Sequence, residues 1–176
     1  MKLAVNLFLS TVFLLLTSMT CYEEFDDCYE GKVDLLDYSI SNANYEGKYP
    51  LKSDDSIKKE AYVIAFESDV IVYDRDSDTV IISAPESNNY VHIPYFSNVK
   101  NSGIKIYCNA DFDDNTPAGS DVTSYFKGDY IYNGTKRDYY YVLRQMPKAG
   151  IHSFKMKVEL TNDSIIEKNT TPILLY

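Results

Sequence analysis

One segment near the end of the chain, HSFKMKVELT at residues 152–161, alternates between apolar and polar side chains after its first histidine. Successive side chains of a β-strand point to opposite faces, so a period of two gathers the apolar members on one face. That face holds His152, Phe154, Met156, Val158 and Leu160. The pattern predicts an antiparallel strand with one face in a core and the other in water, and it excludes an amphipathic helix over this stretch.

Shorter alternations of the same kind occur along most of the chain, with turn residues between them. Two of them flank Asn133-Gly134, a dipeptide typical of two-residue hairpin turns. The first strand-like segment of the chain, at residues 33–40, has an irregularity at Leu35-Leu36. Further strand-like segments are at residues 62–66, 70–73, 79–83, 104–108, 165–166 and 173–176. Roughly eight to ten short strands at this spacing predict an all-β fold, an antiparallel two-sheet sandwich over residues 32–176.

The N-terminus predicts export. Met1-Lys2 gives a positive start, and Leu3–Leu16 is mostly apolar. This run is shorter than the ~20 residues that a membrane-spanning helix needs, and it fits the apolar region of a secretory signal peptide. We therefore assign residues 1–20 to a signal peptide, with a buried N-terminal helix as the alternative.

The next four residues, Ser18-Met19-Thr20-Cys21, resemble a bacterial lipobox, although Ser18 and Thr20 depart from its usual residues. The acids at positions 23, 24, 26 and 27 resemble the surface-export signal of Bacteroidota lipoproteins. This resemblance implies a lipid on Cys21 and an acidic tether over residues 21–31. It also implies a lipid-anchored protein of the bacterial outer membrane, exposed at the surface or facing the periplasm. The alternative is cleavage by the general signal peptidase, which leaves Cys21 as a thiol.

A second resemblance covers PKAGIHSFKMKVEL at residues 147–160. This segment is similar to the penultimate strand of immunoglobulin-like extracellular sandwiches, except that His152 stands where a tyrosine usually makes the corner hydrogen bond. Together with the N-terminus, it makes the chain similar to small Bacteroidota lipoproteins with an immunoglobulin-like domain. The resemblance implies an immunoglobulin-like sandwich in the envelope and brings no catalytic residues with it.

Charge narrows the range of partners. Asp and Glu outnumber Lys and Arg by 26 to 17, which gives a formal net charge of −9. Nucleic-acid binding needs a basic footprint, so we expect no nucleic-acid partner. The partners that we expect are the membrane, through the lipid on Cys21, and a glycan or a protein.

The three cysteines are Cys21, Cys28 and Cys108. If Cys21 carries lipid, an even pair remains in an oxidising compartment, and a disulfide between Cys28 and Cys108 is predicted. The alternative is that Cys108, which shares a strand face with Ile104 and Ile106, is a small buried side chain with a free thiol.

The chain has two histidines, His92 and His152. A metal site with several histidines is therefore excluded, and any Ser/His/Asp-type arrangement needs one of the two. His152 shares the apolar face of its strand, which favours a structural role. His92 stands beside Pro94 without a nucleophile motif. We expect no enzymatic activity; a hydrolase is the alternative if His92 meets a serine or an acid in a cleft.

Two acidic segments begin with the ligand spacing of a calcium-binding loop. The oxygen-bearing residues at alternate positions are Asp74, Asp76 and Asp78 in the first and Asp111, Asp113 and Asn115 in the second. Both segments lack the glycine at position six and the glutamate at position twelve of such a loop. The sequence therefore predicts turn-forming acidic loops, with no metal and no cofactor.

Five tyrosines cluster in a short stretch: Tyr130, Tyr132, Tyr139, Tyr140 and Tyr141. Aromatic faces can bind a flat ligand by stacking, but tyrosine is also a favoured strand residue. The function that we predict is a non-catalytic cell-envelope lipoprotein, a binding or structural module. A glycan-capture accessory lipoprotein that uses exposed tyrosines is the alternative.

Three tripeptides resemble the O-glycosylation acceptor of Bacteroidota: Asp55-Ser56-Ile57, Asp78-Thr79-Val80 and Asp163-Ser164-Ile165. All three lie at predicted loops or strand starts. Whether these sites carry a glycan is left open by the sequence.

Overall fold

The computed structural model describes residues 32–73, 80–82, 96–133 and 136–176. Its strands are β1 (Lys32–Asn44), β2 (Leu51–Lys52), β3 (Tyr62–Tyr73), β4 (Val80–Ile82), β5 (Val99–Cys108), β6 (Phe126–Asn133), β7 (Lys136–Leu143), β8 (Gly150–His152), β9 (Phe154–Leu160), β10 (Ile165–Asn169) and β11 (Ile173–Leu175). Two 3-10 turns, η1 (Lys59–Ala61) and η2 (Thr123–Tyr125), lie between strands. In these ranges no helix is long and apolar enough to cross a membrane.

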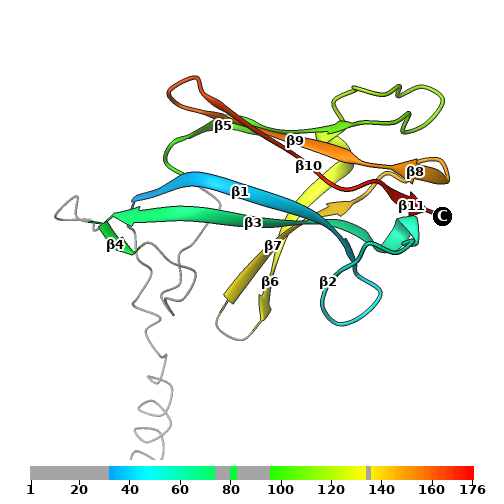
Figure 1. Ribbon diagram of the computed structural model, residues 1–176, viewed down its shortest axis with the longest axis horizontal. Coiled ribbons are helices and arrows are strands. Elements are labelled where there is room, and N and C mark those ends of the chain that lie inside the picture. Colours follow the sequence, from blue (N-terminus) through cyan, green and yellow to red (C-terminus); the bar gives the residue numbers. More distant parts are fainter. Residues whose placement is uncertain (1–31, 74–79, 83–95, 134–135) are drawn as a thin grey trace, which may run out of the picture.

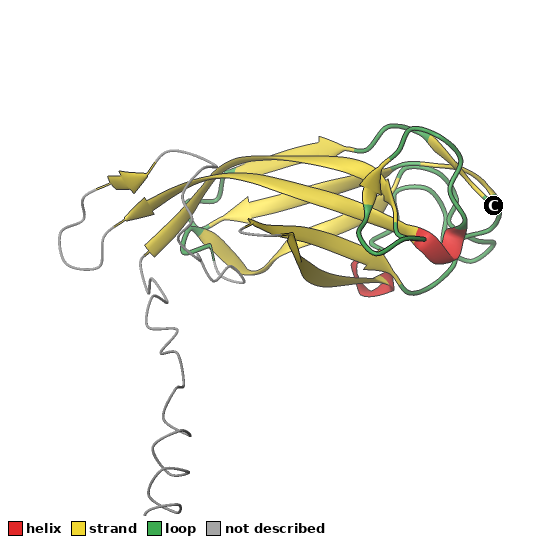
Figure 2. Cartoon of the chain, turned by 90° about the horizontal axis from the view of Figure 1, so that it is seen from below, coloured by secondary structure: helices red, strands yellow, loops and turns green. Residues whose placement is uncertain are grey.

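The strands form two layers (Figures 1 and 2). The larger sheet has the order β2-β1-β3-β7-β6, with β4 paired to β3. The smaller has the order β10-β9-β5, and β8 and β11 form a further two-stranded ladder. With β1, β3, β7 and β6 facing β10, β9 and β5, this is the A-B-E-D against G-F-C order of constant-type immunoglobulin domains. The predicted antiparallel all-β sandwich is confirmed.

The alternating segment at residues 152–160 lies at the centre of the core. Phe154, Met156 and Val158 are each 0% exposed. Immunoglobulin domains join the second and sixth strands by a disulfide two residues after the corner tyrosine. Here that position is Phe154, and its ring lies 5.5 Å, centroid to centroid, from the ring of Tyr62 on β3. Aromatic packing therefore takes the place of the inter-sheet disulfide.

Hydrogen bonds hold β1 against the smaller sheet. The irregularity predicted in the first strand is a β-bulge between Leu35 and Asp37. The side-chain amide of Asn98 bonds to both the backbone N–H and the C=O of Leu35, each at 2.8 Å. Farther along, the Tyr38 hydroxyl donates to the Met156 carbonyl at 2.7 Å, and burial raises the pKa of that hydroxyl.

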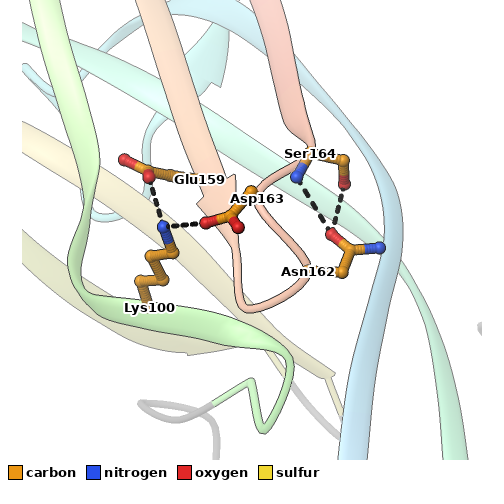
Figure 3. A network of polar contacts seen from close by, with 5 residues as sticks. All are labelled: Lys100, Glu159, Asn162, Asp163 and Ser164. Carbon is orange, nitrogen blue, oxygen red and sulfur yellow. Dashed lines mark hydrogen bonds and ion pairs between the residues drawn. The ribbon is translucent and has the colours of Figure 1, made fainter.

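The turn between β9 and β10 is held by two sets of polar contacts (Figure 3). Lys100 Nζ lies 2.5 Å from Glu159 Oε1 and 2.6 Å from Asp163 Oδ1. These hydrogen bonds hold the pKa of both carboxyls below their ordinary values. Asn162 Oδ1 accepts from the backbone N–H of Ser164 at 3.0 Å and from its hydroxyl at 2.7 Å. The asparagine side chain therefore closes the turn.

The sandwich has two distinct ends (Figure 1). β1 starts at the same end as the β9–β10 turn, whereas β8, β11 and η1 lie at the opposite end.

Candidate functional site

Three apolar side chains lie exposed next to one another at the end of the sandwich opposite the start of β1. Leu174 of β11 stands directly across from Ile151 of β8, and they are 47% and 68% exposed. Tyr176 shares the face of Leu174, because it lies two residues farther along the chain, and it is 51% exposed. Ile173 and Leu175 alternate into the core. We call Ile151, Leu174 and Tyr176 the distal apolar face.

Backbone hydrogen bonds on both sides of β11 hold the distal apolar face. β8 pairs with one edge of β11. Along the other edge, the Ile57 N–H donates to the Leu174 carbonyl at 2.9 Å and the Lys59 N–H donates to the Tyr176 carbonyl at 3.1 Å. Ile57 itself is 0% exposed. A surface fixed in this way is preorganised, so a partner would bind it with little ordering of the chain.

A groove of about 180 Å³ lies on the outer face of the larger sheet. Ala43 and Ala65 line it with small side chains, and Leu51, which is 71% exposed, adds an apolar wall. Lys52 and Glu67 also line the groove and form an ion pair of 2.6 Å. A small apolar floor beside one cation and one carboxylate suits a single polar ring or a side chain of similar size.

The predicted tyrosine cluster does not form an exposed platform in the part of the chain that the structure describes. Tyr139 and Tyr141 are partly buried and pack against the main core, and burial raises the pKa of Tyr141 to about 12. Tyr140 belongs to a separate cluster on the outer face and is 8% exposed. The side chains of Tyr130 and Tyr132 fall outside the described residues.

Two other tyrosines are exposed on the segment that leads into Pro50 of the groove. Tyr45 and Tyr49, in the connection between β1 and β2, are 38% and 36% exposed. Lys48 Nζ lies 5.1 Å from the centre of the Tyr49 ring. The sequence analysis did not single out Tyr45 and Tyr49, because tyrosines are denser at residues 130–141. The signal that could have found it is that a loop marked by Gly47 and Pro50 tends to expose its rings.

His152 has the structural role that its position on the apolar face predicts. It is 2% exposed, and its Nε2 lies 2.8 Å from the Lys148 carbonyl. Since a carbonyl oxygen only accepts, Nε2 carries the hydrogen. This bond back to a carbonyl four residues upstream is the one that a corner tyrosine makes in immunoglobulin-like domains. His92, the other candidate base, lies outside the described residues.

The acidic loop at residues 111–116 is a network of turns. Asp113 Oδ1 accepts from the Asn115 N–H at 2.9 Å, and Asp111 Oδ1 accepts from the Ala118 N–H at 3.0 Å. Phe112 between the two acids is 0% exposed, so the loop is tied to the core. Across the described ranges, no group of three or more His, Cys, Asp or Glu side chains is placed to hold a metal ion. The loop at residues 74–78 lies outside those ranges.

Cys108 is buried on the inward face of β5. Its Sγ lies 3.4 Å from the Pro117 carbonyl. Cys28 and Cys21 lie outside the described residues, so the Cys28–Cys108 bond and the lipid on Cys21 stay predictions.

Two of the three tripeptides that resemble glycosylation acceptors fall in the described ranges. Ser56 and Ser164 are both exposed, and Ser164 lies in the β9–β10 turn (Figure 3). Thr79 lies outside the described residues. The Ser164 hydroxyl itself donates to Asn162 Oδ1 at 2.7 Å.

Comparison of the chain with protein-family models, with curated proteins and with solved structures gives no match.

Proposed function

We propose that the protein is a non-catalytic binding module of the cell envelope, anchored through a lipid on Cys21, and that it binds a protein partner with its distal apolar face. The observation that carries this proposal is the exposure of Ile151, Leu174 and Tyr176 on a backbone ladder. Adjoining exposed apolar side chains of this kind mark interaction sites. Because β1 starts at the other end of the sandwich (Figure 1), an N-terminal anchor directs this face away from the membrane.

The anchor is tested by substitution of the cysteines. In the Cys21→Ala variant we expect the protein to leave the membrane fraction or to stay unprocessed, because acylation supplies the apolar chains that hold it there. Cys28→Ala is the matched control and should fractionate like the wild type. Equal membrane association and equal gel mobility of the Cys21→Ala variant would refute the lipoprotein assignment.

The binding face is tested by site-specific photocrosslinking in intact cells. A photoreactive residue at Leu174 should give a discrete adduct with a partner protein. The same residue at Ile165, which is 50% exposed and lies near the opposite end, is the matched control. Ile151→Ser should remove the Leu174 adduct while leaving the melting temperature nearly unchanged, because the side chain is exposed. Adducts of equal yield from both positions, or none from Leu174, would contradict the proposal.

A second candidate function is glycan capture, and the groove on the larger sheet favours it. An ion pair beside an apolar floor offers a donor and an acceptor to sugar hydroxyls. The exposed Tyr45 and Tyr49 belong to the segment that leads into Pro50, which lines the groove. Titration calorimetry with neutral oligosaccharides tests this reading. Binding that disappears in Glu67→Gln on β3, but not in Glu46→Gln in the β1–β2 connection, would identify the groove as the functional site.

A further inference from the structure

Among the described strands, β6 is an outer strand of the larger sheet. It pairs with β7 over its whole length, and no described strand lies on its other side. Two other strands at or near a sheet edge, β1 and β5, each accept a backbone hydrogen bond from a neighbouring loop. Ser97 donates to the Val33 carbonyl along β1, and Val122 donates to the Ile106 carbonyl along β5. In an antiparallel ladder every second residue turns its N–H and C=O away from its partner, so β6 presents a row of backbone groups to its surroundings.

The first half of this edge is self-complementary in charge. Lys127, Gly128 and Asp129 are consecutive and exposed. Lys127 and Asp129 pair with Val142 and Tyr140 of β7, so both charges lie on the outer face of the sheet, on either side of Gly128. If a second β6 lies antiparallel with Gly128 opposite Gly128, each lysine stands across from the aspartate of the other copy.

We propose that β6 is a self-association surface, and that two copies of the chain pair antiparallel through β6 in the register centred on Gly128. This register makes two opposite-charge pairs between Lys127 of one copy and Asp129 of the other. Directly opposite side chains on neighbouring strands are close enough to interact, and opposite charges there are stabilising whereas like charges are destabilising. The proposal is independent of the distal apolar face.

Edge charges usually prevent strand pairing, because a row of one sign repels a second copy. The arrangement in β6 differs, since the two signs are symmetric about one residue and therefore favour a single register. Because Gly128 has no side chain, the backbone is accessible at the symmetry axis. On the inner face, Tyr141 already covers Gly128 at 3.7 Å from a would-be Cβ, and Phe126 is buried. Pairing at the edge therefore leaves the core undisturbed. Asp129 also interacts within its own chain, so the pair across the axis adds to that contact.

The test is sedimentation velocity of the full-length protein in density-matched detergent over a concentration series. The wild type should dimerise. Lys127→Glu and Asp129→Lys should each weaken dimerisation about tenfold or more, because either change turns two attractive pairs into two repulsive ones. An equimolar mixture of the two variants should form a heterodimer with affinity near that of the wild type, since both pairs are then attractive again.

The control for Lys127→Glu is Lys48→Glu, which makes the same change in net charge in the exposed β1–β2 connection and should leave dimerisation unchanged. The recovery in the mixture also shows that both variants are folded. A wild type that stays monomeric throughout the series, single variants that dimerise like the wild type, or a mixture that fails to recover would each overturn the proposal.

Discussion

The hydrogen bond between Tyr62 and Asn42 gives a sharp test of how the two layers are held together. Tyr62 is 0% exposed and Asn42 is 2% exposed. The Tyr62 hydroxyl donates to Asn42 Oδ1 at 2.8 Å. Asn42 Nδ2 donates in turn to the carbonyl and the hydroxyl of Thr171, each at 2.9 Å. This buried chain links β3, β1 and the segment that precedes β11, which carries the distal apolar face.

We predict that Tyr62→Phe lowers the free energy of unfolding by about 2 kcal/mol. The substitution keeps the ring against Phe154 but leaves Asn42 Oδ1 buried without a donor, and such an orphaned group costs roughly 1–3 kcal/mol. For a domain of this size, that corresponds to a fall in melting temperature of roughly 4–8 °C. Tyr45→Phe, at an exposed hydroxyl, is the matched control and should stay within about 0.5 kcal/mol of the wild type.

A double-mutant cycle separates the hydrogen bond from other effects of the substitution. Asn42→Leu alone removes the Asn42 acceptor of the Tyr62 hydroxyl. In the double variant both partners are apolar, so the combined loss should fall short of the sum of the two single losses by about 1 kcal/mol. Urea unfolding with a fitted slope measures each value. If the two losses add within about 0.3–0.5 kcal/mol, the residues are not coupled and the reasoning is wrong.

Three further predictions concern Gly103 of β5, the ion pairs of Lys100, and the acidic loop at residues 111–116. Gly103→Ala should destabilise the domain by about 1–3 kcal/mol in urea unfolding, since the new Cβ would meet the carbonyl oxygens of Glu159 at 2.7 Å and of Lys100 at 2.8 Å. Lys100 lowers the pKa of Glu159 and Asp163 from their ordinary 4.5 and 3.8. The two carboxylates therefore stabilise the fold at pH values above those ordinary ones, and this contribution is lost as the pH falls through the lowered pKa values. Lys100→Met should therefore flatten the acid side of the plot of unfolding free energy against pH. An unchanged plot would contradict the role of the Lys100 ion pairs. Calcium at millimolar concentration should leave the melting temperature unchanged, and a rise that Asp113→Ala abolishes would show a metal site at that loop.

The sequence predicted a strand wherever one face of that strand is buried and the other is exposed to solvent. The alternation at residues 152–160 predicted which side chains of β9 enter the core, and all of them do. It did not predict that the strand divides at Ser153 into β8 and β9. The division follows from pairing, because β8 bonds to β11 while β9 bonds to β10 and β5. The division into β8 and β9 depends on partner strands that are distant in the sequence, and the local alternation of apolar and polar residues carries no information about them.

The candidate sites depended far more on tertiary structure. The C-terminal run Ile173-Leu174-Leu175-Tyr176 is apolar at every position, so its sequence cannot say which two side chains enter the core. Only the ladder with β8 and Ile57 decides that Leu174 and Tyr176 face outward. The same holds for Tyr140, which lies on the face opposite to its neighbours in the sequence.

The sequence by itself determined the class of fold, since a period of two with turn residues between strands has few compact solutions, and it determined the overall charge. It also determined the expectation of an N-terminal lipid anchor. The tertiary structure decided which apolar side chains remain exposed, that His152 acts as the corner residue through Lys148, and that the charges of β6 lie symmetrically on an outer strand. The physical reason is that alternation is a local property of the backbone, whereas burial depends on which layer or strand comes to lie against each face.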